Sequence, residues 1–148
     1  MFQKDAIYKS VTVNASSAKV WEAITNPELM KKWMLDDEIE ITTTWEPGSA
    51  IVIKGTLHWV YFEDKGTVLK FEPEQTLQYT HLSSLSKLAD EKQNYVIYEF
   101  KLKTVSDKTL LSVSLHNFPT ESIYQHLAFY WSITLNILKH FIETTKFN

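Results

Sequence analysis

Residues 16–34, SSAKVWEAITNPELMKKWM, decide the fold class of this chain. Ser16 or Ser17 is a suitable N-cap for a first helix, because its hydroxyl can accept a hydrogen bond from a free backbone N–H. Asn26 then caps a second helix, and Pro27 is tolerated in the first turn, where its missing N–H has no helical partner anyway. The stretch therefore predicts two short consecutive helices joined by a tight turn.

The sequence on both sides of these helices alternates with a period of two, which is typical of strands. The strand-like segments are 6–14, 38–45, 50–57, 61–73, 75–83, 95–105 and 109–118. Short turns separate most of them, and the polar stretch 84–94 is expected to be a loop. Successive strands with short connections favour an antiparallel sheet, and Gly66 is expected to mark a β-bulge in it.

A long amphipathic helix is predicted from about residue 121 to 145. Its apolar stripe consists of Tyr124, Leu127, Ala128, Trp131, Leu135, Leu138, Phe141 and Ile142. A helix of this length is roughly 36 Å long, enough to cross a whole sheet. We therefore predict an α+β fold in which this helix lies on one face of a sheet of about six or seven strands.

Composition excludes several classes of function. All 15 basic residues are lysines and the formal net charge is −3. Arginine supplies the bidentate contacts to phosphate and guanine, so its absence argues against a nucleic-acid partner. The chain has no cysteine, which excludes disulfides, thiolate catalysis and sulfur-ligated metals. Aromatic residues make up 14%, a supply that suits both core packing and the walls of apolar pockets.

Four segments resemble a known family. They are ASSAKVWEAITNPELMKKWM (15–34), WEPGSAIVIKG (45–55), KGTVLKFEPEQTLQYT (65–80) and FYWSITLNILKHFIE (129–143). They are similar to homologues of the activator of the ninety-kilodalton heat-shock protein's ATPase, which belong to the START-like (SRPBCC), helix-grip superfamily. The resemblance implies a single START-like domain over residues 1–148, with a curved antiparallel sheet wrapped around the C-terminal helix and an apolar cavity between them.

The resemblance does not carry over the chaperone-activating role. The eukaryotic namesake binds the chaperone through an additional N-terminal domain, and the segment before residue 7 is too short to be one. The family also lies near polyketide cyclases and aromatases, so an enzyme of that kind stays open as an alternative.

The expected cavity would be lined by large side chains from the sheet and the last helix. We predict the ligand-binding set Trp33, Trp45, Tyr61, Phe71, Tyr79, His81, His116, Leu127, Trp131 and Leu135. Trp131 is placed in the middle of the cavity, and Trp33 at its mouth. Each aromatic residue has core packing as its competing interpretation, and each histidine has an exposed or structural role. Glu99 is expected on the outer face of the sheet, because the residues of opposite parity in its strand, which would face the core, are apolar.

The favoured function is therefore binding of a small apolar or aromatic molecule. The alternatives are a polyketide cyclase-like enzyme that uses Tyr79 with His81 or His116 as acid–base groups, and a co-chaperone-like interaction module. Histidine and carboxylate spacing suits no metal, Gly-rich phosphate motifs are missing, and no cofactor is expected. Binding is favoured over catalysis.

Two expectations concern partners and compartment. Phe129, Ile133 and Ile137 form a narrow second apolar ridge on the last helix, which predicts a possible homodimer. The N-terminal sequence lacks a signal-peptide pattern, and no run approaches the ~18 apolar residues of a membrane span. We therefore expect a cytoplasmic protein without a membrane span.

Overall fold

The computed structural model describes residues 6–147. The chain begins with β1 (Ile7–Val13), α1 (Ser17–Thr25) and α2 (Pro27–Trp33). Six strands follow, namely β2 (Ile39–Thr43), β3 (Ala50–Leu57), β4 (Val60–Glu72), β5 (Thr76–Ser83), β6 (Val96–Val105) and β7 (Lys108–His116). Two short 3-10 turns, η1 (Ser84–Ser86) and η2 (Lys92–Asn94), lie between β5 and β6, and the long helix α3 is Glu121–Thr144.

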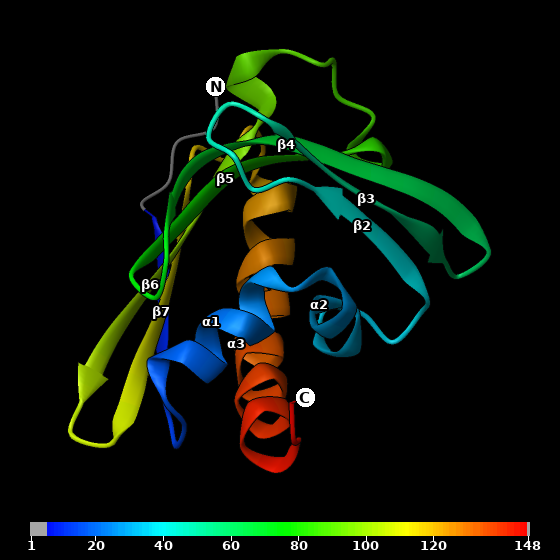
Figure 1. Ribbon diagram of the computed structural model, residues 1–148. Coiled ribbons are helices and arrows are strands. Elements are labelled where there is room, and N and C mark those ends of the chain that lie inside the picture. Colours follow the sequence, from blue (N-terminus) through cyan, green and yellow to red (C-terminus); the bar gives the residue numbers. More distant parts are fainter. Residues whose placement is uncertain (1–5, 148) are drawn as a thin grey trace.

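The strands form one antiparallel sheet in the order β1-β7-β6-β5-β4-β3-β2. Each strand from β2 to β7 lies beside its neighbour in sequence, whereas β1 pairs with β7. The sheet is strongly curved and α3 lies along its concave face (Figure 1). The predicted α+β helix-grip fold is confirmed.

The two short helices are capped as their sequence indicates. The Ser16 hydroxyl accepts from the Lys19 backbone N–H, and the Asn26 side chain accepts from the N–H of Glu28. Trp21 of α1 packs edge-on against Phe71 of β4, with ring centroids 5.2 Å apart. Through this contact α1 is fixed against the sheet.

Helix α3 buries the predicted apolar stripe unevenly along its length. Trp131, Leu135, Leu138 and Ile142 are almost fully buried, and burial of each such side chain is worth about 1.5–3 kcal/mol. The C-terminal half is also attached to the end of β1, because Lys139 Nζ donates to the Thr12 carbonyl oxygen at 2.6 Å. The N-terminal half of α3 borders a hollow.

The bulge predicted at Gly66 is wrong. The change of register between β4 and β5 falls between Val68 and Lys70. Gly66 is required for another reason: a Cβ at this position would overlap the carbonyl oxygen of Thr80 on β5. The glycine therefore allows a close approach of two backbones rather than an extra residue in the strand.

Among residues 6–147, no helix combines the length and the apolar character needed to cross a bilayer.

Candidate functional site

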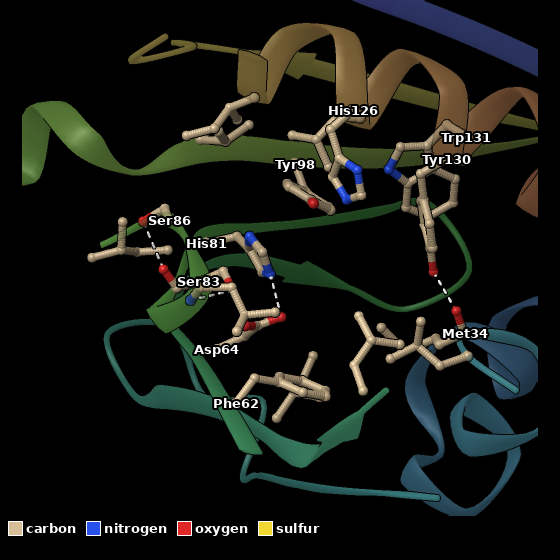
Figure 2. A pocket seen from close by; sticks show the side chains of 18 of the residues that line it. Met34, Phe62, Asp64, His81, Ser83, Ser86, Tyr98, His126, Tyr130 and Trp131 are labelled. Atoms are coloured by element: carbon tan, nitrogen blue, oxygen red, sulfur yellow. Dashed lines mark hydrogen bonds and ion pairs between the residues drawn. The ribbon is translucent and has the colours of Figure 1, made fainter. Parts of the chain in front are cut away.

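A pocket of about 430 Å³ lies between the N-terminal half of α3 and the concave face of the sheet (Figure 2). Its walls come from β2 to β6, the connection after α2, and the turns η1 and η2. Trp131 is the last residue of α3 in the lining, because the helix beyond it packs on β1 and on the two short helices. The volume falls within the range of small-molecule sites, about 300–1,000 Å³.

Most of the pocket wall is apolar. The apolar side chains are Met34, Leu35, Ile39, Ile53, Leu57, Phe62, Leu82, Leu85, Val96, Ile123 and Leu127. They come from elements far apart in the sequence, which the curvature of the sheet brings to one hollow. Such a wall favours a guest with a largely apolar body.

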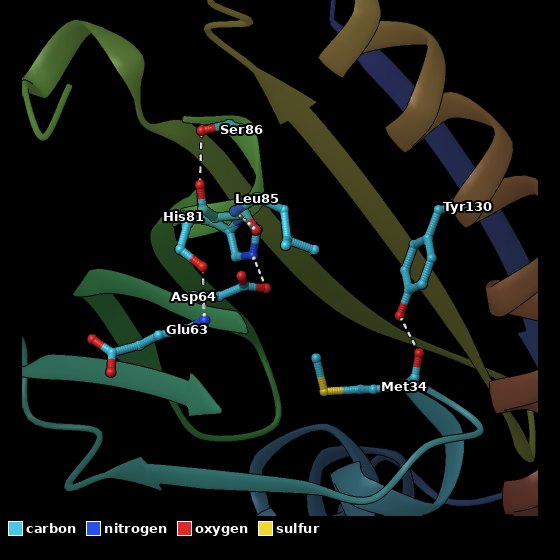
Figure 3. Close-up of polar contacts among 9 residues, drawn as sticks. Met34, Glu63, Asp64, His81, Leu85, Ser86 and Tyr130 are labelled. Carbon is cyan, nitrogen blue, oxygen red and sulfur yellow. Dashed lines mark hydrogen bonds and ion pairs between the residues drawn. The ribbon is translucent and has the colours of Figure 1, made fainter. Parts of the chain in front are cut away.

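Three tyrosines give the wall a polar component. Tyr79 on β5 and Tyr98 on β6 stack with ring centroids 5.3 Å apart, and Tyr130 on α3 donates its hydroxyl proton to the Met34 carbonyl oxygen at 2.6 Å (Figure 3). Burial raises the pKa of all three phenols, and the Asp64 carboxylate adds to the effect. The hydroxyls therefore stay protonated at neutral pH.

A carboxylate and an imidazole face each other in the same wall. His81 Nε2 on β5 lies 3.0 Å from Asp64 Oδ2 on β4 (Figure 3). The two side chains are only 18% and 17% exposed. The His81 ring also lies 5.1 Å from that of Tyr98, so its orientation is fixed from two sides.

One buried polar atom of this wall, Asp64 Oδ1, lacks a hydrogen-bond partner among the described residues, whereas the indole N–H of Trp131 lies within reach of the Tyr98 hydroxyl. The carboxylate oxygen can only accept a hydrogen bond. Unsatisfied buried atoms are few in native proteins, and each has a cost of about 1–3 kcal/mol.

Four of the residues predicted from the sequence lie in the pocket wall: Tyr79, His81, Leu127 and Trp131. Trp131 packs edge-on against Tyr98 with centroids 6.1 Å apart. The alternation of Tyr79 and His81 along β5 brings both side chains to the concave face, as expected if that parity faces inward.

Four other predicted residues pack elsewhere in the core. Trp33 is 4% exposed and donates Nε1–H to the Ala23 carbonyl oxygen at 2.9 Å, so it supports Trp131 from behind and does not cap the mouth. Trp45 donates Nε1–H to the Thr25 carbonyl oxygen and stacks on Phe71 at 5.7 Å. Leu135 lies one turn beyond Trp131 and is covered. These side chains fill the space below the pocket.

The last two predicted residues point away from the pocket. Tyr61 is 62% exposed, because Phe62 and Asp64 occupy the inward parity of β4. His116 is exposed because Leu115, its neighbour on β7, faces the core. Glu99 lies on the outer face as predicted, where its Oε2 accepts from Gln78 Nε2 at 3.1 Å.

Several wall residues lie outside the set predicted from the sequence. Asp64 has a recognisable signal, because it stands between the buried residues Phe62 and Val68 on the inward parity of β4. Tyr130 and His126 lie beside the predicted stripe of α3, and both line the pocket. Within residues 6–147, no cluster of three histidine or carboxylate side chains has a metal-binding arrangement.

The curved sheet, the enclosed helix and the pocket beneath its N-terminal half define a helix-grip protein. Comparison with known families is more specific: the family described as "Activator of Hsp90 ATPase homolog 1-like protein" matches residues 14–143. The chain belongs to this family. No curated protein sequence matches it.

Solved structures share the same fold. ChR145 from Cytophaga hutchinsonii is 34% identical, with 97% of each chain covered and a TM-score of 0.81. The Aha1 dimer from Colwellia psychrerythraea is 22% identical over 97% of this chain and 100% of that one, with a TM-score of 0.73. DynU16, a protein of the dynemicin biosynthetic locus, is 19% identical over 96% of this chain and 48% of that one, with a TM-score of 0.72. The last two likenesses establish the fold alone.

Proposed function

We propose that the chain binds a small, largely apolar or aromatic molecule in the pocket between α3 and the sheet. The observation that carries this proposal is the pocket of about 430 Å³, whose wall is mainly apolar with a few polar groups. Tyr79, His81, Leu127 and Trp131 are the predicted residues that would contact the guest, together with Asp64 and Tyr98. The presence of the structural neighbour DynU16 in a biosynthetic locus agrees with a small-molecule ligand.

Thermal unfolding in the presence of a library of lipids, sterols and aromatic compounds tests the proposal. A ligand that binds only the folded state raises the Tm, and a concentration of 100 times Kd adds about 2.7 kcal/mol of stability. The variant Leu127→Trp fills the pocket and should lose the response. Gln125→Trp, the same change on the exposed side of α3, should keep it. A library without any response would contradict the proposal.

An enzymatic role is a second candidate, and the Asp64–His81 pair favours it. A carboxylate that holds an imidazole at 3.0 Å is an arrangement suited to general acid–base catalysis. His116 takes no part in this alternative, because it is exposed on β7 away from the pocket. Mass spectrometry after incubation of each hit with the protein tests the role: a product that disappears in His81→Gln, while binding remains, supports catalysis.

We further propose that a second copy of the chain covers the ridge of Phe129, Ile133 and Ile137 on α3. These side chains are 68%, 45% and 47% exposed, an unusual run of apolar surface on one helix. The relative from Colwellia psychrerythraea, solved as a dimer, agrees with this proposal.

Sedimentation velocity over a range of concentrations tests the dimer. Ile133→Lys should shift the protein to the monomer, because it places a charge in the apolar contact. Val105→Lys is the matched control, since Val105 is 45% exposed on β6, away from α3. A wild-type protein that stays monomeric at every concentration would contradict the interface.

A further inference from the structure

One hydrogen-bond acceptor in the pocket wall lacks a donor. Asp64 Oδ2 is occupied by His81, but Oδ1 is buried and has no partner among the described residues. A carboxylate oxygen accepts hydrogen bonds only, and those to a charged group are the stronger ones. A guest that brings an O–H or N–H group to this oxygen would satisfy it.

The charges of the wall act against an anionic guest. Asp64 is the one carboxylate in the described lining, which contains no lysine. His81 is already engaged by Asp64, and His126 of the lining is an exposed residue of α3. A second negative charge would therefore approach the largely buried Asp64 carboxylate, where like charges repel more strongly than in bulk water.

The indole N–H of Trp131 does not reverse this balance. It lies within reach of the Tyr98 hydroxyl, and a neutral oxygen of the guest would satisfy it as well as an anionic one. The hydroxyls of Tyr79 and Tyr98 are also protonated at neutral pH, so they can donate to a neutral oxygen of the guest. Neutral oxygen atoms on a guest are therefore sufficient for the remaining polar groups of the wall.

Building on the proposed function, we propose that the guest is a neutral apolar molecule with a hydroxyl or N–H group, and that Asp64 Oδ1 accepts its hydrogen bond. The pocket selects against organic acids of the same size, including free fatty acids. Asp64 thus determines the specificity of the site, and His81 holds the carboxylate in position.

Two matched probe series test the inference by isothermal titration calorimetry at pH 7. The aromatic series is 2-naphthol, 2-methoxynaphthalene and 2-naphthoate, and the aliphatic series is 1-dodecanol, its methyl ether and dodecanoate. In whichever series binds, the alcohol should bind at least about tenfold tighter than the ether, because a hydrogen bond to a charged acceptor is lost. The acid should bind more weakly than the ether.

Two variants assign the preference to Asp64. Asp64→Leu removes both acceptor and charge, so alcohol and ether should bind within about twofold of each other. Asp64→Asn keeps an acceptor without the charge, so binding of the acid should improve while part of the preference for the alcohol remains. Glu99→Gln makes the same change of charge on the outer face of the sheet and should leave all affinities as in the wild type.

The results separate this inference from the proposed function. If neither series nor the wider library binds, the proposed function fails. If probes bind but the ether or the acid equals the alcohol, Asp64 Oδ1 is satisfied by water and the inference is overturned. The inference is also overturned if Asp64→Leu keeps the preference for the alcohol.

Discussion

Individual side chains account for the chemistry of the pocket, and the Asp64–His81 pair is the most informative. Both side chains are largely buried, so the interaction between them offsets the free-energy cost of removing each from water. We expect His81→Leu to lower the free energy of unfolding by about 1–3 kcal/mol, because it leaves the carboxylate unpaired. Urea denaturation measures the change.

The double variant Asp64→Leu/His81→Leu is the control for that prediction. Replacing both partners by apolar groups removes the unpaired charge, so its stability should lie within about 1 kcal/mol of the wild type. A double variant less stable than His81→Leu would show that the pair itself stabilises the fold.

The positions of two tryptophans show which side-chain contacts cannot be predicted from the sequence. Trp33 and Trp131 both stand on apolar helical faces, and the pattern cannot distinguish a side chain that borders a hollow from one that fills it. The difference depends on Ala23, whose carbonyl oxygen accepts the Trp33 indole N–H from a neighbouring helix. Such a contact is tertiary and leaves no trace in local periodicity.

Strands and helices were predicted more fully than individual contacts. The caps of α1 and α2 and the alternation in each strand are local signals, so they can be read directly from the sequence. The position of the pocket along α3 is different, because it depends on which half of the helix the other elements support. The apolar stripe of α3 predicts a cavity centred on Trp131 with Leu135 beyond it, whereas the pocket extends towards the start of the helix.

Between β4 and β5 the separation of the backbones depends on Gly66. A Cβ would overlap the Thr80 carbonyl oxygen, so Gly66→Ala should force the strands apart and destabilise the protein by at least about 3 kcal/mol. Gly48→Ala is a useful comparison, because its Cβ meets no atom and only the positive φ of 91° is unfavourable. That variant should lose about 1 kcal/mol. Equal losses in thermal or urea unfolding would contradict this account.

For the whole chain, the buried phenols predict a loss of stability at alkaline pH. The pKa of Tyr79, Tyr98 and Tyr130 is raised in the folded state by burial. Above about pH 10 the unfolded chain releases phenolic protons that the folded chain retains, so the free energy of unfolding falls with rising pH. Each phenol should contribute about 1.4 kcal/mol per pH unit.

Urea unfolding at a series of pH values from 7 to 11.5 checks this prediction. Tyr98→Phe should reduce the alkaline slope by about a third of the joint contribution of these three phenols, while the dependence below pH 9 remains that of the wild type. An alkaline slope that Tyr98→Phe leaves unchanged would contradict the assignment.

The order of strands in the sheet also has a consequence for biosynthesis. Of the strands in residues 6–147, β1 is made first and pairs with β7, the last, with Ile7 opposite Leu115. While the ribosome is still elongating the chain, β2 to β6 can pair with neighbours already in place, but β1 has to wait until β7 has emerged. Closing so long a loop is slow, so we expect the docking of β1 under the end of α3 to complete the folding of the nascent protein.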